Sequence, residues 1–313
     1  MEKTNIPLLC DPKHGLCEIP TNLYAESRDK LSSESKPVRI IYFTDPICSA
    51  CWAIEPQLRK LKLEYGTSVE IEYRMGGLLP DWNYQKGGIS KPSDVAHHWD
   101  EASRYYQMPI DGDVWLEDPL HSSYPPSIAF KAAQMQDSTK AIRFLRIIRE
   151  MVFLEKKNIA HWEHLSTAAT LVGLSPEKLK HDSADLAVTL FRADLELTRK
   201  IGVRGFPTLF VINNSGHKEY IYGFKPYSVF ESTIAKVCPN APRSNYSKNW
   251  EHLFKIYPTQ TLREFAELSD LTPSQSEELL EKLVHEGELT KQIIKNGTLW
   301  KRKIMAAENN FSL

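Results

Sequence analysis

The hydrophobic pattern divides the first part of the chain into three segments. Residues 38–43 are a short apolar run with β-branched and aromatic side chains, which predicts a strand buried on both faces. Residues 49–65 carry apolar side chains at helical spacing, and residues 69–75 alternate apolar and polar positions. The sequence therefore predicts a unit of strand, helix and strand.

The middle of the chain is helical, and strands return after it. Residues 91–185 have apolar positions at three- and four-residue spacings, which predicts a helical insertion. A helix, a strand, a turn, a return strand and a closing helix are then predicted at 186–201, 208–212, 213–216, 220–222 and 226–237. Two αβ stretches thus flank an all-helical block.

A second, smaller domain is predicted at the end of the chain. Residues 239–247 are rich in Pro, Asn and Ser, which is typical of a linker. Three short helices and a hairpin follow, at 250–256, 262–268, 274–285, 292–294 and 299–301. This is the order of a winged helix, and we expect such a domain over residues 248–305.

Composition and charge exclude several classes of partner. The chain has 39 Lys and Arg against 40 Asp and Glu, so no overall positive field attracts nucleic acid or an anionic membrane. The third helix of the small domain carries Glu277, Glu278 and Glu281, which would repel phosphates. No run of about 18 apolar residues predicts a membrane span. We expect neither nucleic acid nor a membrane as partner.

The first residues contain no apolar run long enough for an export signal, so we expect a cytoplasmic protein. Five cysteines in that compartment are more often reduced, catalytic, redox-sensing or metal-binding than part of a disulfide framework. Their spacing is therefore more informative than their number.

Two of the cysteines form the motif Cys48-Ser49-Ala50-Cys51 between the first strand and its helix. Unpaired N–H groups at a helix start stabilise a thiolate, so Cys48 is the predicted nucleophile. Cys51, one turn later, can resolve a mixed disulfide. The alternatives are a zinc knuckle or two buried thiols, and a zinc knuckle would need a second ligand pair that is not found nearby.

A proline lies just before the buried strand at 208–212. Pro207, if cis, would leave neighbouring backbone groups free to pair with an extended client beside the reactive sulfur. The alternative is an ordinary proline at a strand start. Phe206, Arg204 and Trp52 are candidate client contacts, and Trp52 could equally be core. Two further tryptophans, Trp82 and Trp115, could line the same groove.

The order of these elements, with CSACW at the helix start and VRGFPT before the later strand, resembles the DsbA branch of the thioredoxin superfamily over about residues 37–238. Two shorter segments, DPIC with Glu55-Pro56 and RMGGL at 74–78, are similar to cytosolic FrnE-like members. The resemblance implies an α/β thioredoxin fold over 37–92 and 186–238, a helical insertion over 93–185 and an extension over 1–36.

The same resemblance implies a function. It implies a protein-disulfide oxidoreductase or isomerase that acts on client proteins with thiols or disulfides and needs no cofactor. Cys48, Cys51 and Pro207 match the family's redox-active motif and its cis-proline position by position.

A second resemblance covers nearly the whole chain. It rests on four segments, DGDVW at 111–115, SSY at 122–124, AFKAA at 129–133 and LWK at 299–301. These are similar to the YjbH (SpxH) adaptors, which implies delivery of the thiol-stress regulator Spx to the ClpXP protease. Because both cysteines and VRGFPT are retained, we expect an enzyme and keep the adaptor as the alternative.

Cys10, His14 and Cys17 form a third group near the start of the chain. They could be a second redox pair that exchanges with Cys48, a zinc site that borrows another histidine, or tail thiols without a role. The histidines at 97–98 and at 161 and 164 have no matching cysteine or carboxylate cluster, so we expect no metal there.

Overall fold

A computed structural model of the chain describes residues 10–11, 16–18, 36–83 and 89–303. Its main sheet has the order β4-β3-β6-β7, with bounds Val69–Met75, Val38–Thr44, Thr208–Asn213 and Lys218–Tyr222. β3 pairs parallel with β4 and antiparallel with β6, and β7 is antiparallel to β6. The two αβ stretches thus meet in one sheet, which confirms the predicted thioredoxin fold.

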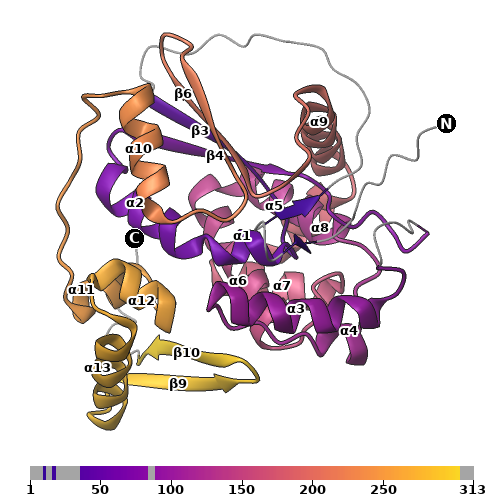
Figure 1. The fold of residues 1–313 in the computed structure, drawn as a ribbon. Coiled ribbons are helices and arrows are strands. Elements are labelled where there is room, and N and C mark those ends of the chain that lie inside the picture. The colour runs from indigo at the N-terminus through magenta and orange to yellow at the C-terminus, as the bar shows by residue number, and fades with distance from the viewer. Residues whose placement is uncertain (1–9, 12–15, 19–35, 84–88, 304–313) are drawn as a thin grey trace.

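Helices cover both faces of this sheet (Figure 1). α2 (Glu55–Tyr65) and α10 (Tyr227–Val237) contact each other on one face, and α9 (Leu186–Lys200) contacts β4 on the other. The central strand β3 is apolar on both faces, with Ile40 buried on one and Phe43 on the other. This double burial is the reason that the strand reads as a continuous apolar run.

The helical insertion lies between β4 and α9, as predicted. Its helices within the described residues are α3, α4, α5, α6, α7 and α8, at Pro92–Tyr106, Val114–Glu117, Tyr124–Gln136, Ser138–Leu154, Trp162–Leu171 and Pro176–Ser183. α5 packs against α6, α8 and α9, so the insertion is continuous with the main core. None of the helices in the described part of the chain is long and apolar enough to cross a membrane.

The segment 49–65, predicted as one helix, is two. α1 (Ser49–Ala53) ends at Ile54, and α2 begins at Glu55. Pro56 has no backbone N–H, so the Trp52 carbonyl cannot receive the usual helical hydrogen bond from residue 56. It accepts from the Ile54 N–H instead, which closes α1 after five residues.

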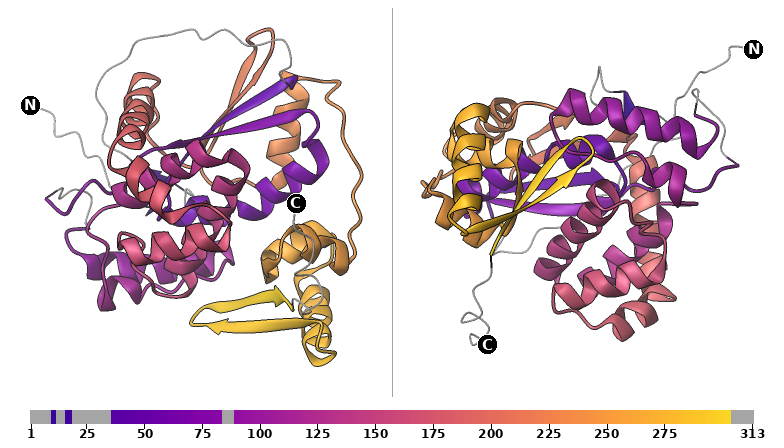
Figure 2. Two further views of the ribbon diagram at one scale, coloured as in Figure 1. Left: turned by 180° about the vertical axis from the view of Figure 1, so that it is seen from behind. Right: turned by 90° about the horizontal axis from the view of Figure 1, so that it is seen from below.

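The C-terminal unit has the element order expected of a winged helix, plus a short strand that the sequence pattern missed. Its elements are α11, β8, α12, α13, β9 and β10, at Trp250–Ile256, Thr259–Thr261, Leu262–Ser269, Pro273–His285, Leu289–Ile294 and Gly297–Arg302. The strands form a sheet in the order β8-β10-β9. Figure 2 shows this unit beside the rest of the chain, and it has its own small core around Phe254 and Phe265.

The C-terminal unit packs directly against the rest of the chain and is not connected to it by the linker alone. Ile294 and Leu299 of its hairpin are buried in the main core. In the predicted linker over 239–247, the Ser244 N–H donates to the Glu64 carbonyl at 2.7 Å, and Arg243 forms an ion pair with the same residue at 2.8 Å. These two contacts therefore hold the linker against Glu64, near the end of α2.

A second sheet involves the start of the chain. β1 (Cys10–Asp11) pairs antiparallel with β2 (Leu16–Glu18), and β2 pairs antiparallel with β5 (Gly205–Phe206). The other residues of the predicted extension over 1–36, His14 among them, lie outside the described residues except for Lys36. No periodicity in the sequence indicates this pairing, because strands of two and three residues are too short to show one.

Candidate functional site

The paired cysteines lie where strand β3 ends and helix α1 begins. Cys48 has an extended backbone and caps α1, and its Sγ accepts a hydrogen bond from the Cys51 N–H at 3.1 Å. The first N–H groups of a helix have no partner inside it, so the sulfur takes the place of the usual capping oxygen. Both thiols are fully buried.

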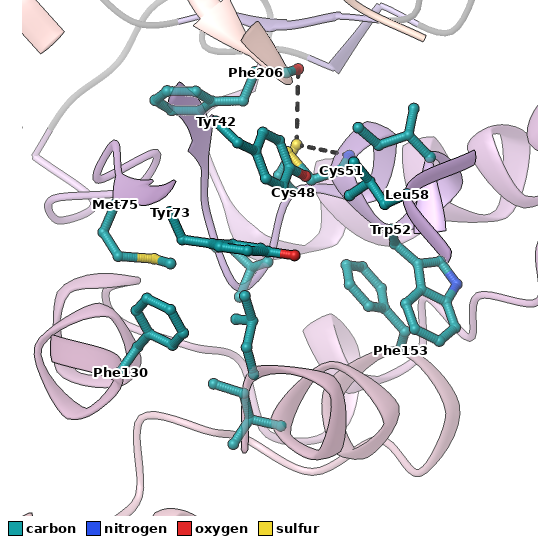
Figure 3. Packing of buried hydrophobic residues seen from close by; sticks show 14 of the residues in the cluster. Tyr42, Cys48, Cys51, Trp52, Leu58, Tyr73, Met75, Phe130, Phe153 and Phe206 are labelled. Carbon is teal, nitrogen blue, oxygen red and sulfur yellow. Dashed lines mark hydrogen bonds between the residues drawn. The ribbon is translucent and has the colours of Figure 1, made fainter. Parts of the chain in front are cut away.

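The proline loop faces the first cysteine, as predicted. The Cys48 thiol donates to the Phe206 carbonyl at 3.7 Å, and the peptide bond between Phe206 and Pro207 is cis. Figure 3 shows the Cys48 sulfur between this carbonyl and the Cys51 N–H. The structure thus brings together the two thiols and the proline loop. In the sequence, Pro207 lies 156 residues after Cys51 and further still from Cys48.

The Asp45 carboxylate fixes the turn that carries Cys48. It accepts hydrogen bonds from the Ile47 N–H at 3.0 Å, the Leu78 N–H at 2.7 Å and the Ser123 hydroxyl at 2.9 Å. The group is fully buried, and burial raises the pKa of Asp45 to about 6 although all three hydrogen bonds oppose the shift. In the sequence Asp45 is only the first residue of the DPIC segment, and nothing in that segment indicates this anchoring role.

Arg149 of α6 is fully buried and interacts electrostatically with both thiols. Its guanidinium donates to Glu55 and to the Thr44 hydroxyl, both at 2.6 Å, and to the Asp45 backbone carbonyl at 3.2 Å. Burial disfavours the cation, but nearby Tyr42, Glu55 and the two cysteines more than offset this and raise the pKa of Arg149. A permanent positive charge is therefore fixed beside the cysteine pair.

The two thiols differ in their tendency to ionise, in the opposite sense to the prediction. Burial raises the pKa of Cys48, and its hydrogen bond with Cys51 raises it further. Burial also acts to raise the pKa of Cys51, but its side-chain interaction with Cys48 and the charge of Arg149 outweigh it and lower that pKa. The predicted Cys48 thiolate is thus disfavoured here, because the sulfur is shut off from water.

Two of the three predicted client contacts are core residues. Trp52 is fully buried, stacks on Phe153 and donates from Nε1 to the Pro109 carbonyl at 3.1 Å. Phe206 is also fully buried, and its ring packs so closely on Gly76 that a Cβ there would lie 1.6 Å from it. The interpretation of Trp52 and Phe206 as client contacts is therefore wrong, and only Arg204 is exposed.

The predicted aromatic groove is also core. Trp115 is buried, and Trp82 is half-buried with its Nε1 donating to the Leu120 carbonyl at 2.8 Å. The rings of Trp82 and Trp99 both meet the Trp115 ring edge to face. These contacts bind the insertion together instead of lining a client site.

The remaining candidate residues are the histidines of the insertion and the two cysteines near the start of the chain. His97 contacts Glu101 at 3.1 Å and His161 contacts Asp118 at 3.3 Å. No group of three or more His, Cys, Asp or Glu able to hold a metal occurs among residues 10–11, 16–18, 36–83 and 89–303. Cys10 and Cys17 are opposed residues of β1 and β2, and Cys17 is opposed to Phe206.

Comparisons with known proteins agree with this geometry. A family model described as thioredoxin matches residues 42–232. A putative protein disulfide isomerase from Nitrosomonas europaea superposes with a TM-score of 0.57 and 18% identity, covering 64% of this chain and 97% of its own. The cytosolic disulfide reductase DsbM from Pseudomonas aeruginosa gives 0.52 and 21%, covering 64% and 100%. The chain is a DsbA-like member of the thioredoxin superfamily.

Relatives that extend over both domains define its family more closely. The ClpXP adapter protein SpxH of Halalkalibacterium halodurans is 34% identical, covering 93% of this chain and 96% of its own. The SpxH protein of Bacillus subtilis is 29% identical, covering 85% and 89%. The chain belongs to the SpxH family of ClpXP adapter proteins.

This membership corrects the predicted activity. The sequence predicts a protein-disulfide oxidoreductase because both cysteines and the proline loop are retained, and that prediction is wrong. The relatives that match most of the chain are named adapter proteins, whereas the likeness to disulfide enzymes is one of fold. A retained Cys-x-x-Cys geometry does not by itself define an enzyme, since function depends on what the site is able to expose.

Proposed function

We propose that this protein is an adaptor that binds a regulator protein and holds it for degradation by the ClpXP protease. The proposal rests on how much of the chain each similarity covers. The match to the SpxH relative covers 93% of this chain. The match to the disulfide isomerase from Nitrosomonas europaea covers only 64% of this chain, although it uses 97% of the isomerase. The part of the chain beyond that fold is therefore shared with adaptors.

The docking of the C-terminal unit supports the same function. Glu264 of α12 is fully buried and accepts hydrogen bonds from Arg146 of α6 at 2.6 and 3.1 Å. Near the hairpin tip, Lys295 contacts Asp100 at 2.7 Å and Asp113 at 2.6 Å. An adaptor must hold its cargo in a fixed orientation, and contacts of this kind join the two domains into one body.

The state of the thiols fits binding better than turnover. Cys48 is fully buried with a raised pKa, so an attacking thiolate is scarce, whereas a binding surface needs none. The cargo is a thiol-stress regulator of the Spx kind, as the family resemblance implies.

Degradation of Spx by purified ClpXP, with and without the full-length chain, tests the proposal. We expect several-fold faster loss of Spx when the chain is present. A Cys48→Ser, Cys51→Ser double variant is expected to accelerate degradation to the same extent, because binding uses the fold and not the thiols. The proposal fails if the chain binds Spx without accelerating its loss, or if acceleration disappears with the thiols in a variant that remains folded.

A further inference from the structure

Strand β2 occupies the backbone edge beside the proline loop. It pairs antiparallel with β5, with Cys17 opposed to Phe206 and Glu18 opposed to Gly205. β2 also contacts α1, the helix that Cys48 caps. An exposed strand edge is a template for an added strand, and here a piece of the chain itself supplies that strand.

The register places Cys17 opposite the residue that contacts the buried thiol. Phe206 is the partner of Cys17 in the strand pair, and the carbonyl of Phe206 is the acceptor for the Cys48 thiol at 3.7 Å. A shift by one residue would present the neighbour of Cys17 on the opposite face, because side chains alternate along a strand. Among the residues of β2, Cys17 is thus the one whose backbone is paired with the acceptor of the Cys48 thiol.

Cys10 stands in an equally defined relation to Cys17. The two are directly opposed in the antiparallel pair of β1 and β2. Opposed residues have Cα atoms about 4.5–5.5 Å apart, within the range of roughly 4.4–6.8 Å that a disulfide spans. The backbone register therefore places Cys10 opposite Cys17, and Cys17 opposite the residue whose carbonyl accepts from the Cys48 thiol.

We propose that Cys10 and Cys17 are an internal dithiol that passes two electrons to a disulfide between Cys48 and Cys51. This inference does not depend on the adaptor function. Because both thiols are buried, the oxidant must be small: hydrogen peroxide first converts Cys48 and Cys51 to the disulfide and is itself reduced to two molecules of water. The Cys17 thiolate then attacks the Cys48 sulfur, and the bond to Cys51 breaks.

The exchange balances without a further reactant. Cys51 leaves as a thiolate next to the Arg149 charge, which favours its departure. The Cys10 thiolate then attacks Cys17 and releases Cys48. Cys10 and Cys17 each lose a proton while Cys51 and Cys48 each gain one, so the products are a Cys10–Cys17 disulfide and a reduced Cys48–Cys51 pair.

Trapping the mixed disulfide tests the register. The full-length chain is prepared with Cys10→Ser, Cys51→Ala and Cys238→Ser, which leaves Cys17 and Cys48, and is treated with hydrogen peroxide. Peptide mass spectrometry without reductant then measures the link between them. The matched controls move the thiol by one residue, as Cys17→Ser with Leu16→Cys or with Glu18→Cys.

We expect the link from position 17 to exceed that from position 16 or 18 by about tenfold, because a thiol in register has the higher effective concentration. Equal links from all three positions would overturn the proposal, since a flexible tail would give that result. Circular dichroism spectra that match the unaltered chain establish that each variant is folded.

A second measurement uses the natural cysteines. After oxidation of Cys48 and Cys51, peptide maps over time are expected to show a Cys10–Cys17 disulfide that forms at a rate independent of protein concentration. Cys17→Ser is expected to abolish its formation and preserve the Cys48–Cys51 disulfide. A rate proportional to protein concentration, or persistence of the original disulfide in the unaltered chain, would contradict an internal exchange.

Discussion

Asp45 beside the thiols and Glu264 at the domain junction are both fully buried carboxylates, yet their environments differ in one respect. Asp45 is held by neutral donors, two backbone N–H groups and the Ser123 hydroxyl, and Arg149 reaches only its backbone carbonyl. Glu264 is held by cations, with Arg146 at 2.6 Å and Arg59 at 3.3 Å.

The difference appears in the charge that each carboxylate carries. Burial raises the pKa of Asp45 to about 6, so this group changes charge close to neutral pH. Burial acts on Glu264 in the same direction, but Arg146 and Arg59 outweigh it and lower the pKa of Glu264. The domain junction is therefore a fixed charge cluster, whereas the site around the cysteines remains able to titrate.

The largest effect is expected from Glu264→Gln. The change leaves Arg146 and Arg59 buried without their full counter-charge, which typically costs about 3–5 kcal/mol. The free energy of unfolding in urea, followed by circular dichroism, measures this cost. Because Glu264 joins two units with separate cores, we also expect the single transition to separate into two.

Glu267 on the same helix provides the matched control. It is partly exposed and contacts Lys60 at 3.3 Å, and such surface pairs are worth about 0–1 kcal/mol. Equal losses from Glu264→Gln and Glu267→Gln would show that the buried cluster does not hold the junction.

A smaller, pH-dependent effect is expected at Asp45. Between about pH 4 and pH 6 the folded state binds more protons at this group than the unfolded state, so stability falls as pH rises. Subtracting the unfolding free energy of Asp45→Asn from that of the unaltered chain isolates this contribution. Between pH 4 and pH 8 the difference should fall by about 2–3 kcal/mol, from roughly two pKa units at about 1.4 kcal/mol each.

Asp270 serves as a control, because its contribution to stability changes with pH in the opposite direction. Burial acts to raise its pKa, but hydrogen bonds from Lys248 and Lys60 outweigh this and lower it. Stability from Asp270 is therefore lost as pH falls through the acid range, the reverse of Asp45. A flat difference curve for Asp45→Asn would mean that folding does not raise the pKa of Asp45.

The comparison also shows which features a sequence is able to reveal. The strands predicted at 38–43 and 69–75 and the thiols at the helix start follow from local periodicity and motif, and the structure has them in those places. The facing of the proline loop and Cys48 is expected because the family resemblance implies it. Local rules also explain the break at Ile54 once Pro56 is considered, although the apolar stripe conceals it.

Pairings between distant segments could not be predicted in this way. Nothing local to Glu264 indicates Arg146 as its partner, and nothing local to Cys17 indicates Phe206. The burial of Trp52 likewise depends on contacts with Phe153 of α6 and with Pro109, and the helical pattern does not predict this packing. The sequence specifies the elements here, and long-range packing decides which of their faces meet.

Trp52 offers the finest test, because it lies between the two regions. Its ring belongs to the helix of the thiols, and the Arg146 guanidinium stacks on it at 4.3 Å while pairing with Glu264. Trp52→Phe weakens this stacking, because the smaller ring offers less π surface, and removes the hydrogen bond to Pro109, so we expect a loss of about 1–3 kcal/mol in unfolding free energy.

Combining Trp52→Phe with Glu264→Gln reveals whether the charge cluster at the domain junction and the site around the cysteines are energetically coupled. Residues that share a partner deviate from additivity by about 0.5–3 kcal/mol, and we expect at least the lower value because Arg146 is common to both. Trp52→Phe combined with Glu267→Gln should be additive to within about 0.5 kcal/mol, since Glu267 contacts Lys60 instead. If both pairs prove additive, the charge cluster at the junction is energetically separate from the cysteine site, and the two carboxylates belong to independent parts of the fold.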